Sequence, residues 1–291
     1  MHYIDARKLT LRDFCSPCEH MWQAHRRPDP TVPELQKPND QFVQSFARGL
    51  SVIRAFGPDA REMTLSEVAE RTGLTRAAAR RILLTLQQLG YVAATGRKFF
   101  LTPRILDLGY SYLSTTPLWD LAEPYMEELV SRVHESSSAS VLDGTDIVYI
   151  LRVPTKKIMT ISLSIGSRLP AYCTSMGRIL LGGLSAGELD NVLKKSDLKA
   201  ITPHTVIDPA RLKQIIRDDC AKGWSLVNQE LEEGLVSLSV PIQDRTGRIV
   251  AAMNVSGQAT RTSADEMVRT ILPQLQRAAL QIGDALKMRA A

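Results

Sequence analysis

The segment 64–101 places two helix-start signals and a hairpin signal in an order that few folds use. The sequence TLSE at 64–67 is a capping box, in which the threonine hydroxyl and the glutamate carboxylate each accept the other residue's backbone amide. Gly73 ends that helix, and Thr75 is the N-cap of a second helix that continues to Leu89. Two short helices joined by a tight turn are therefore expected. The residues expected to face inward on the second helix are Ala78, Ile82, Leu86 and Leu89.

A helical run and a hairpin flank these two helices. Apolar residues at helical spacing cover 42–56 before them, and Gly90-Tyr91-Val92 opens a β-hairpin after them. The hairpin turns at Gly96-Arg97-Lys98 and returns through Phe99-Phe100-Leu101. Helices followed by such a hairpin predict a winged helix-turn-helix domain over residues 42–103.

The second helix carries residue types that read DNA. In a helix-turn-helix the start of this helix lies in the major groove, where arginine can clamp guanine with two hydrogen bonds. A small Ala77 allows contact with a thymine methyl group, and the helix start capped by Thr75 can hold a phosphate. The predicted DNA-binding residues are Thr75, Arg76, Ala77, Arg80 and Arg81 on this helix and Arg97 and Lys98 at the wing tip.

The net charge of the chain is concentrated in the same region. Residues 42–110 carry ten Arg or Lys against five Asp or Glu, whereas residues 1–41 carry six of each sign and residues 111–291 carry twenty of each. The formal charge of +5 therefore indicates a polyanionic partner for one segment alone. The alternative is a structural helical hairpin with a solvated basic surface. The order of capping box, turn glycine, arginines and basic wing favours double-stranded DNA as the partner.

The remainder of the chain mixes helical and strand patterns. Helices are expected over 105–113 as a connector and over 118–134, 173–194 (as a pair), 209–222 and 263–287. Strands are expected over 138–142, 147–153, 158–165, 224–229, 235–243 and 249–256. Consecutive strands with helices at the margins predict an α+β fold with a GAF/PAS-like domain, rather than a doubly wound sheet.

Composition excludes several classes of protein. No run approaches the ~20 apolar residues of a membrane span, and the N-terminus lacks the apolar run of a signal peptide, so we expect a cytoplasmic protein that enters no membrane. The four cysteines are too few for a disulfide framework in 291 residues. Cys15 and Cys18, with His20 and His25 nearby, are of zinc-ligand types but lack a second pair, so no metal site and no cofactor are predicted.

Three stretches of the sequence resemble the IclR family of bacterial transcriptional regulators. They are LTRAAARRILLTLQQLGYV at 74–92, GSRLPAYCTSMGRILL at 166–181 and GWSLVNQELEEGLVSLSVPIQDRTGRIVAAMNVSG at 223–257. Within the family, RLPAYCTSMGR and NQELEEGL are similar to the PcaR, PcaU and PobR group, which regulates protocatechuate and 4-hydroxybenzoate catabolism in the β-ketoadipate pathway. The resemblance covers nearly everything after residue 42 and implies a ligand-responsive regulator of an aromatic-acid catabolic operon.

The resemblance also implies partners and organisation. A homodimer or homotetramer would bind a palindromic operator, with RNA polymerase as a further partner, and a small organic acid of the protocatechuate, 4-hydroxybenzoate or β-ketoadipate class would be the effector. The expected organisation is the winged helix-turn-helix at 42–103, a linker helix at 104–117 and an effector-binding and oligomerisation domain at 118–291. Residues 1–41 lie outside the resemblance, and their prolines mixed with charges predict a flexible extension. The implied effector pocket contains Cys173, Thr174, Ser175, Met176, Val227, Ser237, Asn254 and Ser256.

The residue types of this pocket suit a carboxylate ligand. The backbone amides of Ser175 and Met176 open a helix, and hydroxyl and amide side chains would form the opposite wall. The alternative is that these small polar residues only satisfy backbone groups near a sheet edge, which would leave a ligand-independent DNA-binding scaffold.

A second alternative is a thiol-dependent hydrolase with an accessory DNA-binding module. Cys173 would be its nucleophile and His134 or His204 its base. Neither histidine lies in a recognisable catalytic motif, so we predict no catalytic residue and expect Cys173 to be a thiol that lines an apolar pocket. A charged loop before a strand is expected at Glu230, Glu232 and Glu233.

Overall fold

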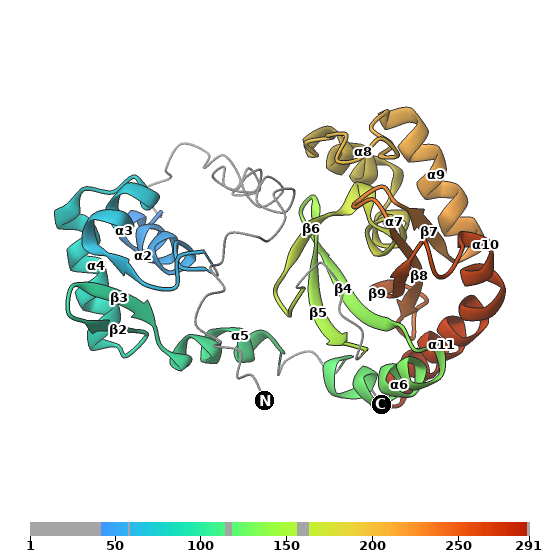
Figure 1. Cartoon of the computed structure of the whole chain (residues 1–291), viewed down its shortest axis with the longest axis horizontal. Coiled ribbons are helices and arrows are strands. Elements are labelled where there is room, and N and C mark those ends of the chain that lie inside the picture. Colours follow the sequence, from blue (N-terminus) through green and yellow to red (C-terminus); the bar gives the residue numbers. More distant parts are fainter. Residues whose placement is uncertain (1–41, 58, 114–117, 156–162, 290–291) are drawn as a thin grey trace, which may run out of the picture. The chain divides into compact units, whose positions relative to one another are not determined.

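The computed structural model describes residues 42–57, 59–113, 118–155 and 163–289 (Figure 1). The expected extension at 1–41, with Cys15 and Cys18, lies outside these residues, as does the end of the expected linker at 114–117. Within the described ranges, every helix is too short or too polar to cross a membrane.

The N-terminal part of the described chain forms three helices and a small antiparallel sheet (Figure 1). The helices are α2 (Gln44–Arg54), α3 (Leu65–Thr72) and α4 (Arg76–Gln88), and the strands are β1 (Met63–Thr64), β2 (Val92–Thr95) and β3 (Lys98–Leu101). The strand order is β1-β3-β2. The predicted hairpin is confirmed as β2 and β3, whereas β1 was not predicted because two residues are too few to show an alternating pattern.

Both helix starts form as the sequence predicts. Thr64 N donates to Glu67 Oε2 at 2.7 Å, and Thr64 Oγ1 accepts Glu67 N at 3.4 Å, so the capping box is complete. The bond from the Thr64 backbone is the largest of the causes that lower the pKa of Glu67. Gly73 takes the left-handed φ of 66° that ends α3, and Thr75 Oγ1 accepts Ala78 N at 3.2 Å to begin α4.

The buried face of α4 lies one residue away from the expected stripe. Ala79 and Leu83 are fully buried in a cluster with Val52, whereas Leu89 is 51% exposed. The expected inner face is therefore confirmed for Leu86 and wrong for Leu89, whereas Ala78 and Ile82 are half-buried. Apolar residues lie on both sides of the stripe, so spacing alone does not determine the helix rotation, and tertiary packing does.

The C-terminal part is built on one six-stranded antiparallel sheet in the order β6-β5-β4-β9-β8-β7 (Figure 1). Its strands are β4 (Ser136–Asp143), β5 (Asp146–Val153), β6 (Arg168–Pro170), β7 (Ser225–Asn228), β8 (Leu235–Gln243) and β9 (Ile249–Gln258). The helices are α5 (Leu106–Leu113), α6 (Leu118–Val133), α7 (Ser175–Gly182), α8 (Ala186–Lys195), α9 (Pro209–Lys222), α10 (Ala264–Glu266) and α11 (Leu272–Arg289).

Helices cover both faces of this sheet. One hydrophobic cluster joins α6 and α11 to the strands and contains Met126, Met253 and Ile282. A second cluster joins α7, α8 and α9 to the opposite face and contains Met176 and Ile216. The alternation of side chains along each strand therefore sends both sets into a core, and the predicted α+β class is confirmed.

Three elements differ from the expectations. The strand expected over 158–165 falls largely outside the described residues, and the described strand of this region is β6, which pairs with β5. The helical pair expected over 173–194 separates into α7 and α8 after a 3₁₀ turn at Ala171–Cys173. The closing helix contains a π-helical turn at Met267–Ile271, which follows from Pro273, since its nitrogen cannot donate to the carbonyl of Arg269.

Candidate DNA-binding surface and effector pocket

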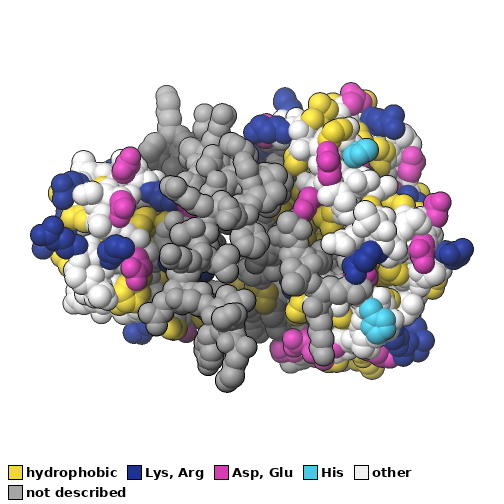
Figure 2. Space-filling model, in the orientation of Figure 1, with side chains coloured by type: hydrophobic (Ala, Val, Ile, Leu, Met, Phe, Trp, Pro, Cys, Tyr) yellow, Lys and Arg dark blue, Asp and Glu magenta, His cyan; other side chains and the backbone are white. Residues whose placement is uncertain are grey.

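The arginines of α4 project from the start of the helix into solvent. Thr75, Arg76, Ala77, Arg80 and Arg81 are all exposed; Thr75 caps α4, and the spacing of the other four places them on one face of the helix. In Figure 2 dark blue Lys and Arg side chains stand out on this part of the molecule, at the left. This is the geometry that a recognition helix needs to reach phosphates and base edges.

The turn between β2 and β3 presents two further cations. Arg97 and Lys98 are both exposed, as expected for the tip of a wing. Lys98 Nζ lies 3.7 Å from Glu62 Oε2, so part of its charge is already balanced within the protein. Arg97 is therefore the stronger candidate for a phosphate contact.

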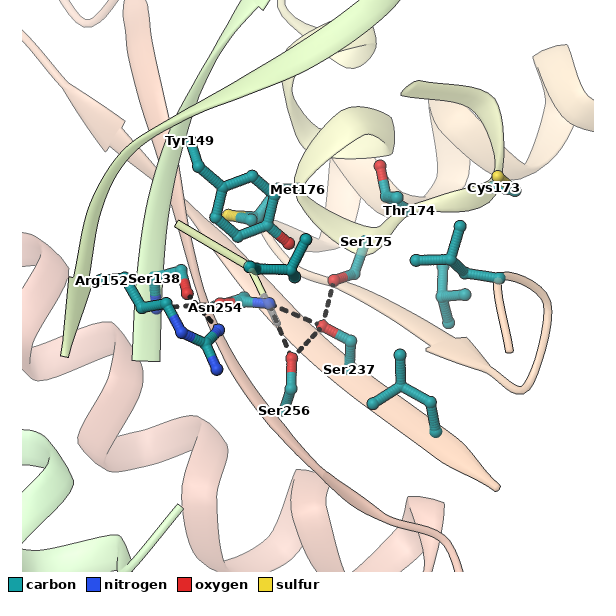
Figure 3. Close-up of a pocket in the computed structure, with 14 residues that line it drawn as sticks. Ser138, Tyr149, Arg152, Cys173, Thr174, Ser175, Met176, Ser237, Asn254 and Ser256 are labelled. Carbon is teal, nitrogen blue, oxygen red and sulfur yellow. Dashed lines mark hydrogen bonds between the residues drawn. The ribbon is translucent and has the colours of Figure 1, made fainter. Parts of the chain in front are cut away.

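All eight residues expected to form the effector pocket line one cavity in the C-terminal part (Figure 3). They come from α7 and the turn before it, and from β7, β8 and β9, so segments far apart in the sequence meet at this cavity. Six lining residues were not predicted: Ser138, Tyr149, Arg152, Leu163, Leu231 and Leu235.

Asn254 is the centre of the polar wall. Its Nδ2 donates to Ser237 Oγ at 2.9 Å and to Ser256 Oγ at 2.8 Å, and its Oδ1 accepts the backbone amide of Ser138 at 3.0 Å. The side chain thus bridges β4, β8 and β9 (Figure 3). The structure thus brings the small polar residues of β8 and β9 together on one wall.

Ser175 connects this wall to α7. Its hydroxyl donates to Ser237 Oγ at 2.8 Å and lies 2.6 Å from Ser239 Oγ. Hydroxyl hydrogens rotate, so these groups can bond to one another or turn toward a ligand. The hydroxyls can therefore bond to a ligand, and they pair with one another when no ligand is bound.

The start of α7 lies at the pocket. Thr174 caps the helix through the bond from Gly177 N to its Oγ1, at 3.2 Å. The first backbone bond of the helical type runs from Arg178 N to Thr174 O, at 3.0 Å. The amides of Ser175 and Met176 precede that bond, so they belong to the helix end that leaves donors for a capping group or an anion.

Arg152 brings a positive charge to the pocket, and the sequence reasoning missed it. Ser140 pairs with Tyr149 and Ala139 with Leu151, so Ile150 is an extra residue in β5 and forms a β-bulge. The bulge shifts the alternation and directs Arg152 to the same side as Tyr149. No simple alternating pattern could have shown this.

The guanidinium of Arg152 lies beside the polar wall. Its Nη1 is 3.5 Å from Ser138 Oγ, at the limit of a hydrogen bond, and the side chain is half-buried. Ser138 in turn donates its backbone amide to Asn254 Oδ1 at 3.0 Å, so the group lies next to the Asn254 cluster (Figure 3). A carboxylate at this place would find a charged donor and several neutral ones.

Tyr149 supplies a buried phenol. The side chain is 5% exposed, and burial raises the pKa of its hydroxyl to about 12 against the opposing effect of the nearby Arg152 charge. The hydroxyl is therefore a protonated donor at all physiological pH values, directed into the pocket (Figure 3).

Cys173 is a neutral lining group rather than a nucleophile. Burial, together with the smaller effect of the Glu230 carboxylate, raises the pKa of its thiol to about 12. The thiolate is the reactive form, so a thiol with this pKa is inert. Neither His134 nor His204, the bases considered for a hydrolase, lies among the lining residues.

Glu230 does not follow the expectation of a charged surface loop. It is buried and its carboxylate meets the guanidinium of Arg178 at 2.7 Å, whereas Glu233 stays outside the core. Burial also raises the pKa of Glu232. The pairing of Glu230 with Arg178 could not be predicted from the spacing of charges, because the two residues are 52 positions apart in the sequence.

An exposed arginine-bearing helix-turn-helix, in one chain with a second domain that holds a pocket lined by polar and apolar groups, is typical of a DNA-binding regulator. The IclR helix-turn-helix domain matches residues 45–96, and the bacterial transcriptional regulator IclR C-terminal domain matches residues 110–284. The chain belongs to the IclR family, and it is a transcriptional regulator rather than an enzyme.

Individual relatives agree with this assignment. The Pca regulon regulatory protein of Pseudomonas putida is 45% identical over 235 residues, which cover 80% of this chain and 81% of that protein. A crystal structure of a transcriptional regulator from Rhodococcus sp. RHA1 is 51% identical, with a TM-score of 0.77, and the match covers 84% of this chain and 98% of that one.

The fold is also shared with a ligand-bound structure. An IclR homologue from Microbacterium hydrocarbonoxydans, crystallised in complex with 4-hydroxybenzoate, has a TM-score of 0.75 at 24% identity, over 85% of this chain and 100% of that chain. At this level of identity the likeness shows the fold.

Proposed function

We propose that this regulator senses a small aromatic acid of the 4-hydroxybenzoate or protocatechuate class in its C-terminal pocket and controls an aromatic-acid catabolic operon. Two relatives support this ligand class, since one is named for the Pca regulon and another holds 4-hydroxybenzoate. The chemistry of the pocket supports it independently.

The place of Arg152 is the observation that carries the proposal. Arg152 is the one cation among the described residues that line the pocket, and a guanidinium binds a carboxylate through two charge-assisted hydrogen bonds. The apolar lining residues Leu163, Leu231 and Leu235 suit the faces of a ring. A flat apolar group with a carboxylate at one end matches both features.

The start of α7 provides a second polar end. In the view of Figure 3, Ser175 and Arg152 lie on opposite sides of Asn254. We place the carboxylate at Arg152 and a ring hydroxyl toward Ser175, which revises the expectation that the amides of Ser175 and Met176 take the carboxylate. β-Ketoadipate carries a carboxylate at each end and would use both sites.

The DNA-binding half of the proposal is a symmetric oligomer on a pseudo-palindromic operator. One recognition helix reads too few base pairs for specificity, so two half-sites should lie about one helical turn, ~34 Å, or a multiple of it apart. Helix α5 exposes Leu106, Tyr110 and Tyr112, and a second copy of the chain is the proposed cover for these apolar side chains. Footprinting that shows a monomer on one asymmetric site would contradict the oligomer.

A thermal-shift screen tests the sensing half. A ligand that binds the folded state at 100 times its Kd stabilises it by about 2.7 kcal/mol. 4-Hydroxybenzoate, protocatechuate and β-ketoadipate should therefore raise the Tm, whereas cyclohexanol, which lacks the carboxylate, should not. An unchanged Tm with all three acids would favour the ligand-independent scaffold.

A further inference from the structure

A buried ion pair lies behind the effector pocket. The Arg178 and Glu230 side chains are 3% and 9% exposed, and Arg178 Nη2 donates to Glu230 Oε2 at 2.7 Å. A buried pair seldom stabilises a fold more than apolar residues of the same volume would. Neither side chain lines the pocket, but the pair connects α7 to the loop between β7 and β8.

Arg178 holds the start of α7. It lies one turn after Ser175 in the same helix, and its Nε donates to the backbone oxygen of Tyr172 at 3.1 Å. The guanidinium thus braces the segment that carries Cys173 and the first turn of α7, which together form one side of the pocket.

Glu230 holds the loop between β7 and β8. Its Oε2 accepts the Val206 amide at 3.0 Å as well as the Arg178 bond, and its backbone oxygen accepts Thr205 Oγ1 at 2.6 Å. The preceding residue, Gln229, takes a φ of 63°, a conformation that a non-glycine residue keeps only when its surroundings fix it. Thr202 Oγ1 donates to the Gln229 oxygen at 2.6 Å and supplies part of that restraint.

The loop fixed in this way forms the apolar wall of the pocket. Leu231 follows Glu230 directly, and Leu235 begins β8 at the other end of the loop; both line the cavity. The ion pair therefore joins the polar side of the pocket, at α7, to its apolar side, at the loop.

From these contacts we infer that Arg178 and Glu230 are positioning residues for the effector pocket. They hold Leu231 at a fixed distance from the start of α7, and this spacing determines how tightly the pocket closes on a ring. The inference rests on the proposed function, because it assigns the pair a role in binding that ligand.

Four variants of the full chain separate positioning from stability. Glu230→Gln removes the charge but keeps the shape, and Leu231→Ala removes the wall itself. The double variant Arg178→Met/Glu230→Leu replaces the pair by apolar groups, which commonly restores or raises stability, and it serves if the single variant does not fold. Glu128→Gln, which breaks the exposed Arg132–Glu128 pair on α6, is the control.

Hydrogen exchange tests the loop directly. Gln229 N donates to Leu235 O at 2.7 Å and Gly234 N to Gln229 Oε1 at 2.9 Å, so both amides report on the loop. We expect exchange over 229–235 to be at least about tenfold faster in the Glu230 variants, with α11 unchanged. Exchange at the wild-type rate in the loop would overturn the inference.

Calorimetry with 4-hydroxybenzoate completes the test. Both Glu230 variants should bind it about 3- to 30-fold more weakly, and the double variant should do so at a Tm no lower than that of the wild type. A double variant that binds like the wild type would show that the pair serves only the fold. If the wild type binds no acid, the proposed function fails, and the exchange measurement alone then decides whether the pair positions the loop.

Discussion

Tyr149 and Arg152 lie on the same side of β5, although residues three apart on a regular strand point to opposite sides. The bulge at Ile150 produces this arrangement. It brings a buried phenol and a cation together on the wall of a pocket that otherwise contains only neutral groups.

Arg152 should therefore determine whether the pocket distinguishes an acid from a neutral compound. Charged hydrogen bonds contribute about 1.5–3 kcal/mol, so Arg152→Met should weaken 4-hydroxybenzoate binding about 10- to 150-fold. Calorimetry should show that the wild type prefers 4-hydroxybenzoate to 4-hydroxybenzamide and that the variant has lost this preference. Arg132→Met, on the exposed side of α6, is the control. An undiminished preference in Arg152→Met would place the carboxylate elsewhere.

Operator affinity should depend on the first turns of α4. Replacement of Arg76 or Arg80 by Ala should weaken operator binding by about 1–3 kcal/mol and relax specificity at one base pair, because both side chains project freely from the helix start. Mobility-shift titrations with operators altered at single positions measure both effects, with the exposed Arg211→Ala as control. If the variant with both Arg76→Ala and Arg80→Ala binds the operator with wild-type affinity, α4 is not the recognition helix.

The wing residues should contribute to the affinity for DNA of any sequence and not to base specificity. Arg97→Ala should weaken binding to all sequences nearly equally and reduce the slope of log K against log salt by about 1, as expected when one phosphate contact is lost. Lys98→Ala should have the smaller effect, because Glu62 already lies near its ammonium group. A base-specific loss in Arg97→Ala would indicate that the wing reads the groove.

Because Cys173 is buried, its thiol should react slowly with an alkylating reagent. An unfolded thiol ionises near 9.0, whereas the folded pKa is about 12, so the native protein should resist iodoacetamide at Cys173 at pH 8 and label at the exposed Cys220. The same raised pKa predicts that the contribution of the neutral Cys173 thiol to the free energy of unfolding is fully present below pH 9.0. This contribution is lost as the pH rises toward 12. Peptide mass spectrometry checks the labelling. Rapid native labelling of Cys173 would revive the hydrolase alternative.

Local chemistry made much of this molecule predictable. The caps at Thr64 and Thr75 depend on neighbouring residues alone, and both formed. The eight pocket residues also met as expected, because the resemblance carried information about long-range contacts that spacing cannot supply.

What the sequence did not reveal depends on packing between distant elements. The bulge at Ile150 arises from the pairing of β4 with β5, and it reverses the side on which Arg152 lies. The burial of Glu230 requires Arg178, which is 52 residues away. The rotation of α4 was decided by its neighbours, since its sequence offered two apolar stripes.

Calorimetric titration of the wild type and Asn254→Ala tests the central claim most directly. Asn254 donates to Ser237 and Ser256 and accepts from Ser138, so its removal takes hydrogen bonds from the pocket wall at about 1–3 kcal/mol for each lost bond. The exposed Asn228→Ala is the matched control.

The wild type and Asn228→Ala should bind at least one of 4-hydroxybenzoate, protocatechuate and β-ketoadipate. Asn254→Ala should lose that binding while it retains operator affinity in the absence of the acid. Equal affinity in Asn254→Ala and the wild type would move the effector site elsewhere, and no binding of any of the three acids by the wild type would contradict the account.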